Sequence, residues 1–247
     1  MSDMPAASAP ALELVDVAKR YGSGPTEVRA LTNVNLTVEP GEFVAVMGPS
    51  GSGKSSLLHL AGGLERPSDG RVVVGGTDLD TLDGAGLAAL RRQAVGYVFQ
   101  RLNLVPTLTA LENVMLPLEL DGLAPKVARR RAMEALDRVS VGAPLRRYPD
   151  DLSGGEQQRV AIARAIVGDR SLLLADEPTG ALDSVTGDLV VELLASLVTE
   201  RGCALVLVTH DPRYASWADR IVRVRDGVLT EETRPSGIGD EIEAATR

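Results

Sequence analysis

The sequence is poor in several residue types that would indicate particular kinds of protein. Its 247 residues include one cysteine, Cys203, and two histidines. A single cysteine excludes an internal disulfide framework and favours a reducing compartment. With so few nitrogen and sulfur ligands, a zinc site is disfavoured as well.

Long apolar runs and an excess of basic charge are also missing. No run reaches the ~18 apolar residues that span a bilayer. The first ten residues lack the basic and apolar regions of a signal peptide, so we expect none. The chain has 26 basic and 34 acidic residues and a formal charge of −8. Because nucleic-acid binding needs a basic face, we expect no nucleic-acid partner.

What is present is typical of a globular α/β protein. Apolar residues make up 44% and charged residues 24% of a chain long enough for one large domain. Continuous apolar runs at 43–47, 172–175 and 204–208 are typical of strands buried on both faces of a parallel sheet. Segments with helical periodicity lie between them. This alternation predicts a parallel sheet with helices on both faces.

One stretch interrupts this alternation. Within residues 101–153, apolar residues recur at helical spacing over 108–118 and 127–139, which predicts a helical subdomain inserted between 12–100 and 154–230 of an α/β lobe. The whole forms a single domain over 12–230. We expect flexible tails at residues 1–11 and 231–247.

The sharpest motif is the glycine-rich segment 48–55, Gly-Pro-Ser-Gly-Ser-Gly-Lys-Ser, which matches the phosphate-binding pattern G-x-x-x-x-G-K-[ST]. It follows a buried strand and opens a helix, so backbone N–H groups and the helix N-terminus can face a phosphate. Only three basic residues are lysines, and Lys54 is the one in this motif. It can bridge the β- and γ-phosphates, and Ser55 can bind Mg²⁺. The residues expected to bind the nucleotide here are Gly48, Ser50, Gly51, Ser52, Gly53, Lys54, Ser55 and Ser56.

Two adjacent carboxylates, Asp176 and Glu177, end one of the buried strands. A carboxylate at the carboxyl end of a strand beside a phosphate loop is placed to bind Mg²⁺, and we expect this of Asp176. Glu177 can act as a general base toward an attacking water. Acidic strand ends are common in proteins, and the phosphate loop upstream is what favours the functional interpretation.

A second anion-binding surface is predicted where another helix begins. Its first residues, Ser153, Gly154 and Gly155, offer a hydroxyl and N–H groups at a helix N-terminus. The chain therefore has two separate phosphate-binding surfaces.

In this order, these motifs resemble those of the ATP-binding subunits of ABC transporters, over residues 12–230. Segment 48–55 is similar to Walker A and 152–157 to the signature motif. Asp176 and Glu177 are similar to the end of Walker B and the catalytic glutamate. The resemblance adds a Q-loop residue, a D-loop residue, a switch histidine and an aromatic that stacks on adenine, which are Gln100, Asp183, His210 and Tyr21.

The resemblance implies a fold and a mode of assembly. The fold is a P-loop NTPase (RecA-like) core with a parallel sheet, an antiparallel β subdomain near the N-terminus and an inserted helical subdomain. The assembly is a head-to-tail homodimer in which ATP on Walker A of one copy is covered by the signature of the other. The signature residues are Ser153, Gly154, Gly155 and Glu156.

It also implies ATP and Mg²⁺ as cofactors. The metal ligands would be Ser55, Gln100 and Asp176. The catalytic residues would be Glu177, His210 and Lys54.

Within the family, the segments 21–31, 99–106 with 111–114, and 175–183 are similar to the lipoprotein-release, macrolide-export and cell-division branch. The resemblance implies a separate transmembrane permease with four spans and a large extracytoplasmic domain. ATP would then drive export or extraction of a lipoprotein, peptide or amphipathic drug. We expect a cytoplasmic protein, peripheral on the inner face of the cell membrane through that permease.

Two alternatives remain open from the sequence. One is a regulatory ATPase of the cell-division type that signals through a membrane partner. The other is a soluble ABC ATPase without a transport role. The stretch between Lys54 and Ser153 carries no sustained heptads, which argues against the DNA-repair members with a long coiled coil.

Overall fold

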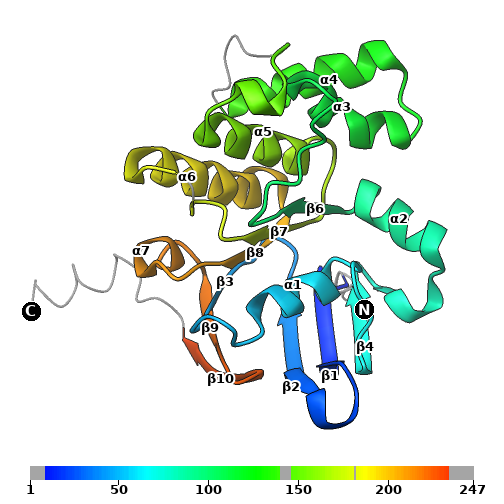
Figure 1. Ribbon diagram of the computed structural model, residues 1–247, viewed down its shortest axis with the longest axis vertical. Helices are drawn as coiled ribbons and strands as arrows, with labels where there is room; N and C mark the ends of the chain where they lie inside the picture. The colour runs from blue at the N-terminus through cyan, green and yellow to red at the C-terminus, as the bar shows by residue number, and fades with distance from the viewer. Residues whose placement is uncertain (1–8, 140–145, 181, 234–247) are drawn as a thin grey trace, which may run out of the picture.

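The computed structural model describes residues 9–139, 146–180 and 182–233. Within these ranges, the central sheet has six strands in the order β10-β9-β3-β8-β7-β6 (Figure 1). Its strands are β3 (Phe43–Met47), β6 (Val95–Val98), β7 (Leu172–Asp176), β8 (Ala204–Val208), β9 (Arg220–Arg225) and β10 (Val228–Thr233). Neighbouring strands pair in parallel except for β9 and β10, which are antiparallel.

A second, antiparallel sheet has the order β2-β1-β4-β5. Its strands are β1 (Leu12–Tyr21), β2 (Val28–Val38), β4 (Asp69–Val74) and β5 (Thr77–Asp78). Short 3-10 helices cover Gly24–Thr26, Leu79–Thr81 and Pro149–Asp151. The α-helices are α1 (Lys54–Ala61), α2 (Gly84–Gln93), α3 (Ala110–Leu120), α4 (Pro125–Arg138), α5 (Gly154–Ile166), α6 (Ser184–Arg201) and α7 (Pro212–Ala215).

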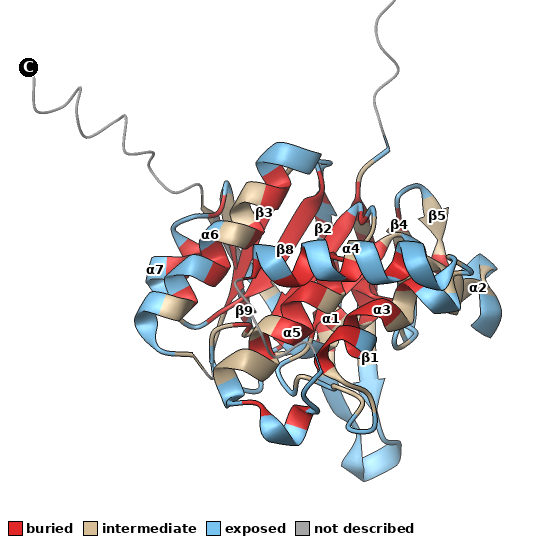
Figure 2. Cartoon of the chain, turned by 90° about the horizontal axis from the view of Figure 1, so that it is seen from above, coloured by how far each residue is buried: buried red, intermediate tan, exposed pale blue. Residues whose placement is uncertain are grey.

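The central sheet is buried on both faces, as its apolar strands predict. Phe43, Ala45 and Met47 of β3 pack in a core with residues of α3, α4, α5 and α6. The alternate residues Val44 and Val46 pack in a second core with α1 and the antiparallel sheet. The cartoon in Figure 2, coloured by burial, shows these strands buried between outer helices whose solvent sides are exposed. The two faces follow from the period-2 alternation of strand side chains.

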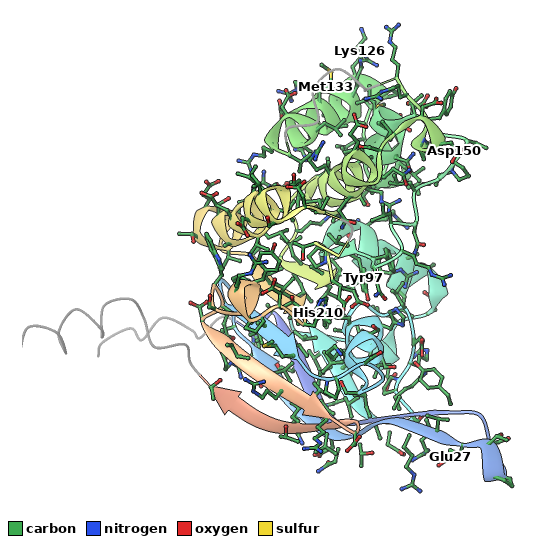
Figure 3. The ribbon with its side chains drawn as sticks, turned by 60° about the vertical axis from the view of Figure 1, so that its left-hand side comes forward. Glu27, Tyr97, Lys126, Met133, Asp150 and His210 are labelled. Carbon is green, nitrogen blue, oxygen red and sulfur yellow. The ribbon has the colours of Figure 1, made fainter. Side chains whose placement is uncertain are left out.

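The helical subdomain lies at the end of the molecule opposite the antiparallel sheet. Lys126 and Met133 of α4 mark one end in Figure 3, and Glu27, beside the β1–β2 turn, marks the other. Buried Ala128, Ala132 and Ala135 recur at helical spacing and seat α4 on the core. Among the described residues, none of the helices combines the length and hydropathy that a membrane crossing requires.

The observed fold confirms the predicted class, and the ends of the domain need correction. Strand β10 continues to Thr233, so residues 231–233 belong to the sheet and not to a tail. At the other end, the backbone N–H of Ala11 donates to the carbonyl of Val38 and its own carbonyl accepts from Gly75, so this residue is held against the antiparallel sheet just before β1 begins. Residues 1–8 and 234–247 lie outside the described ranges. The missed strand follows a two-residue turn, Asp226-Gly227, whose positive φ angles of 50° and 76° suit a tight hairpin.

A buried asparagine holds the segment between β6 and α3. Asn113 is fully buried, and its Oδ1 accepts a hydrogen bond of 2.8 Å from the Val105 N–H. Its Nδ2 lies within 3.1 Å of three carbonyl oxygens, those of Val105, Leu108 and Thr109. From α5, the guanidinium of Arg164 donates to the carbonyls of Leu102 and Asn103. The segment after Gln100 is therefore attached to both α3 and α5.

We expect Asn113→Leu to lower the free energy of unfolding by about 2–4 kcal/mol, because backbone groups of this segment lose their partners inside the protein. Equilibrium denaturation in urea measures the change. Glu119→Gln, an exposed substitution on the same helix, serves as the control and should stay within about 0.5 kcal/mol of the wild type. An equally small effect for Asn113→Leu would show that the segment does not depend on this side chain.

Candidate nucleotide-binding site

The glycine-rich loop joins β3 to α1 in a conformation that requires glycine at two positions. Gly48 has a φ of 157° and Gly53 a φ of 105°. A Cβ on Gly48 would lie 2.1 Å from the Val224 carbonyl oxygen, and one on Gly53 would lie 2.3 Å from the Ala30 carbonyl oxygen. Both distances are far below a van der Waals contact. Strand ends from both sheets therefore press against the loop and fix its path.

Lys54 reaches across this loop. Its Nζ donates hydrogen bonds of 2.8 Å to the carbonyl oxygens of Gly48 and Pro49. The side chain is largely buried at the first position of α1. The ammonium group thus lies inside the curve of the loop, where a phosphate would meet it and the first N–H groups of α1 together.

A cavity of about 400 Å³ opens in front of the loop. Most residues predicted for the site line it, from four separate parts of the chain. The lining residues are Val28, Arg29, Ala30, Gly48, Ser50, Gly51, Gly53, Lys54, Ser55, Ser56, Gln100, Asp176, Glu177 and His210.

Two predicted nucleotide-binding residues do not line this cavity, and three lining residues were not predicted. Ser52 is buried behind the loop, where its carbonyl accepts from the Gly227 N–H. Tyr21 lies at the end of β1, with its hydroxyl directed to Ser56 and Glu65. The unpredicted residues come from the start of β2 and are Val28, Arg29 and Ala30. Nothing in their local sequence marks them, because the packing of the second sheet brings them to the loop.

The donor set for a metal ion lies between α1 and β7. Asp176 is 5% exposed at the end of β7 and accepts a hydrogen bond from the Ser55 side chain. Burial raises the pKa of Asp176, and the hydrogen bond from Ser55 acts in the opposite direction. A hydroxyl and one carboxylate are the oxygen ligands with which Mg²⁺ is usually held beside substrate phosphates. The residues present therefore fit this metal.

Glu177 contacts three residues from other parts of the chain. Its Oε2 accepts from Gln100 Nε2 at 3.3 Å, and its Oε1 lies 3.4 Å from His210 Nδ1. Its own N–H donates to the carbonyl of Val208 at the end of β8. The φ of Glu177 is 46°, a left-handed conformation that is uncommon for a residue other than glycine. The structure thus brings together the expected general base Glu177 with Gln100 and His210, which the resemblance gave as a metal ligand and as the switch histidine.

The signature residues lie at the start of α5, outside the phosphate-loop cavity. Ser153 caps α5 in a reciprocal capping box with Glu156: the Ser153 N–H and Oγ donate to Glu156 Oε2 at 2.8 and 2.9 Å. These bonds hold the pKa of Glu156 below its usual range. Ser153 and Gly154 are exposed, and an added Cβ on Gly154 would meet nothing within 4 Å, so the start of α5 is open at these two residues. None of these residues lines the phosphate-loop cavity.

The D-loop residue Asp183 has a similar capping role. Its carboxylate accepts from the N–H and the hydroxyl of Thr186, at 3.0 and 2.7 Å, and begins α6. Hydrogen bonds from Thr186 lower the pKa of Asp183. Residue 181, two positions before Asp183, lies outside the described ranges.

Comparisons with known proteins agree with this geometry. Residues 31–180 match the family described as ABC transporter. The chain is 50% identical over 216 residues to the lipoprotein-releasing system ATP-binding protein LolD of Geobacter metallireducens, covering 87% of this chain and 96% of that protein. It is 47% identical over 224 residues to the macrolide export ATP-binding/permease protein MacB of Hyphomonas neptunium, covering 91% of this chain. The chain spans only 35% of the length of that relative.

Solved structures show the same fold. The dimeric structure of the ABC transporter cassette MJ0796 superposes with a TM-score of 0.88 at 43% identity, covering 92% of this chain and 100% of that chain. A protein of that name from Methanocaldococcus jannaschii is 44% identical over 233 residues, covering 93% of this chain and 99% of that protein. A second MJ0796 structure, of a post-hydrolysis state bound to ADP and Pi, gives the same TM-score and identity, with the same coverage of the two chains.

Proposed function

Because this chain belongs to the ABC transporter family and is an ATP-hydrolysing subunit of the type found in lipoprotein-release and macrolide-export systems, we propose that its ATPase cycle drives a membrane permease. The observation that carries the hydrolytic part of the proposal is the cluster of Gln100, Glu177 and His210, which all line the phosphate-loop cavity. An ATP-binding module without hydrolysis would not need a carboxylate held between an amide and an imidazole beside the phosphates.

In the proposed reaction, the glycine loop and Lys54 bind the β- and γ-phosphates of ATP. Glu177 accepts a proton from a water molecule while the water oxygen attacks the γ-phosphorus. The bond from that phosphorus to the bridging oxygen breaks, and ADP and phosphate are released. His210 orients the water and contacts the γ-phosphate.

Ser55, Asp176 and Gln100 would hold Mg²⁺. The metal would neutralise charge on the β- and γ-phosphates. Gln100 follows directly on β6 and already contacts Glu177. A shift of this amide would therefore alter both the metal ligands and the position of the base.

The open first turn of α5 supports a head-to-tail dimer. Ser153, Gly154 and Gly155 offer phosphate-binding groups at a helix N-terminus, and none lines the cavity of its own chain. A second copy would supply these groups to the nucleotide from outside. The similar cassette MJ0796 has been solved as a dimer.

A groove beside the Q-loop suits a helix of the permease. A cavity of about 390 Å³ is lined by apolar and aromatic residues that include Tyr97, Phe99, Pro117 and Leu120. Arginines from α2, α5 and the segment before β7 also line it, namely Arg91, Arg92, Arg164 and Arg170. Arg164 already donates to the carbonyls of Leu102 and Asn103, and Arg170 is buried, which leaves Arg91 and Arg92 of α2 as the accessible basic edge. An apolar lining with a basic edge suits an amphipathic helix that carries acidic side chains on one side. Because Phe99 directly precedes Gln100, a helix that docks on Phe99 can shift Gln100 and so change its contact with Glu177.

We expect the ATPase rate to rise when this chain is purified together with the membrane protein encoded by the neighbouring gene. The stimulated rate should be lost in Glu177→Gln and in Leu120→Asp, which places a charge in the groove. The matched control is Leu189→Asp on α6, because Leu189 is exposed by 58% and Leu120 by 62%; it should keep the stimulation. Failure to form a complex, with no stimulation, would favour an ATPase without a permease.

A further inference from the structure

A carboxylate outside the cavity joins three side chains near the phosphate loop. Glu65 lies in the loop between α1 and β4. Its Oε2 accepts a hydrogen bond of 2.8 Å from the Tyr21 hydroxyl and lies 2.8 Å from Lys19 Nζ. Its Oε1 lies 3.3 Å from His59 Nδ1. Glu65 therefore links the end of β1 to the helix that follows the phosphate loop.

Lys19 occupies one face of the Tyr21 ring. Its Nζ is 4.9 Å from the ring centroid, within the range of a cation–π contact. The same ammonium donates to the carbonyl of Arg66 at 2.9 Å, and the side chain is 13% exposed. Tyr21 itself is 37% exposed. A planar ligand that stacks on Tyr21 must therefore use the face opposite Lys19.

The ring is also held relative to the phosphate loop. The Tyr21 hydroxyl lies 3.2 Å from the Oγ of Ser56, in the first turn of α1. Ser56 lines the phosphate-loop cavity and follows Lys54 and Ser55. The hydroxyl is thus fixed from two sides, by Ser56 and by Glu65.

We propose that Glu65 and Lys19 are positioning residues that hold Tyr21 as a single-faced platform for the base of the bound nucleotide. The inference rests on the proposed function, in which ATP occupies the adjacent cavity. A ring whose hydroxyl is bonded to Glu65 and whose rear face is covered by Lys19 cannot rotate freely. A base that stacks on it then loses less conformational entropy than on a mobile ring.

The ionisation of Glu65 agrees with this arrangement. Its partial burial raises the pKa, but hydrogen bonds from Lys19 and Tyr21 outweigh that effect and lower the pKa below its usual value. The carboxylate is therefore charged at neutral pH, where it can hold both the ammonium and the hydroxyl.

The test compares two ligands that share the triphosphate chain, of which only ATP carries the nucleoside with its base. ATP and inorganic tripolyphosphate are titrated against wild type, Glu65→Ala, Lys19→Met and Tyr21→Ala by calorimetry. Loss of stacking in Tyr21→Ala should weaken ATP binding by roughly 5- to 100-fold. Glu65→Ala and Lys19→Met should weaken it by about 3- to 10-fold. Tripolyphosphate affinity should stay unchanged in all three.

Asp80→Asn is the matched control, because it removes the exposed ion pair of Arg66, the residue next to Glu65, without touching Tyr21. It should bind both ligands as the wild type does. Equal weakening of ATP and tripolyphosphate in Glu65→Ala would mean a general structural role and would overturn the inference. Unchanged ATP affinity in Glu65→Ala, with reduced affinity in Tyr21→Ala, would overturn it too and leave the proposed function intact. If the wild type hydrolyses ATP and the Tyr21→Ala variant binds ATP as tightly as the wild type, Tyr21 is not the platform for the base.

Discussion

Replacing Glu177 with glutamine is expected to lower ATP hydrolysis by about 10²- to 10⁴-fold, the usual contribution of a general base. Glutamine has nearly the same shape, so contacts with Gln100 and His210 can persist. It lacks the negative charge needed to accept a proton from water. ATP binding rests on the glycine loop and Lys54 and should be kept.

The measurement is the steady-state rate of phosphate release, together with the ATP dissociation constant of the same preparation. The variant should also accumulate as an ATP-bound dimer in size-exclusion chromatography, because hydrolysis no longer separates the subunits. Glu119→Gln changes an exposed carboxylate that does not line the phosphate-loop cavity, and this control should hydrolyse ATP at the normal rate. Normal turnover in Glu177→Gln would reject Glu177 as the base.

Ser153→Arg is expected to abolish hydrolysis while leaving ATP binding to the phosphate loop unchanged. The physical reason is the position of Ser153 at the open N-terminus of α5, outside the cavity of its own chain. A long cationic side chain there would block the approach of this surface to a nucleotide on a second copy. The phosphate loop of the same chain is not changed by this substitution.

Mixing variants separates action between chains from action within one chain. A Lys54→Ala chain has a defective phosphate loop and an intact signature, and Ser153→Arg has the reverse. A heterodimer of the two contains one composite site in which both parts are intact. The mixture should therefore regain hydrolysis that neither variant shows alone. Absence of any recovery, with both chains folded and forming a heterodimer, would contradict the head-to-tail arrangement.

The central strands and the phosphate loop were predictable from the sequence because their signals are local. The strands β3 and β8 were predicted with their observed limits, since a continuous apolar run is enough to mark a strand buried on both faces. The phosphate loop was predictable from its glycines, because the backbone geometry at Gly48 and Gly53 excludes other residues.

The parts that escaped prediction depend on contacts between distant segments. Strand β10 carries acidic residues and lies at the edge of the sheet, so it lacks the apolar run of a central strand. Arg29 lines the cavity because β2 of the second sheet lies against the loop. Ser52 has the sequence context of a phosphate ligand, and its side chain is buried behind the loop. The order of residues along the chain does not show which distant segments contact one another in the folded protein.

The left-handed backbone of Glu177 has a consequence for how this sequence can evolve. Holding a non-glycine residue in that region costs of order 1–3 kcal/mol, and a glycine would remove the cost. Selection for stability alone would therefore favour losing the glutamate. A more stable glycine at this position would lack the carboxylate beside Gln100 and His210, so stability and the proposed chemistry are opposed at this one residue.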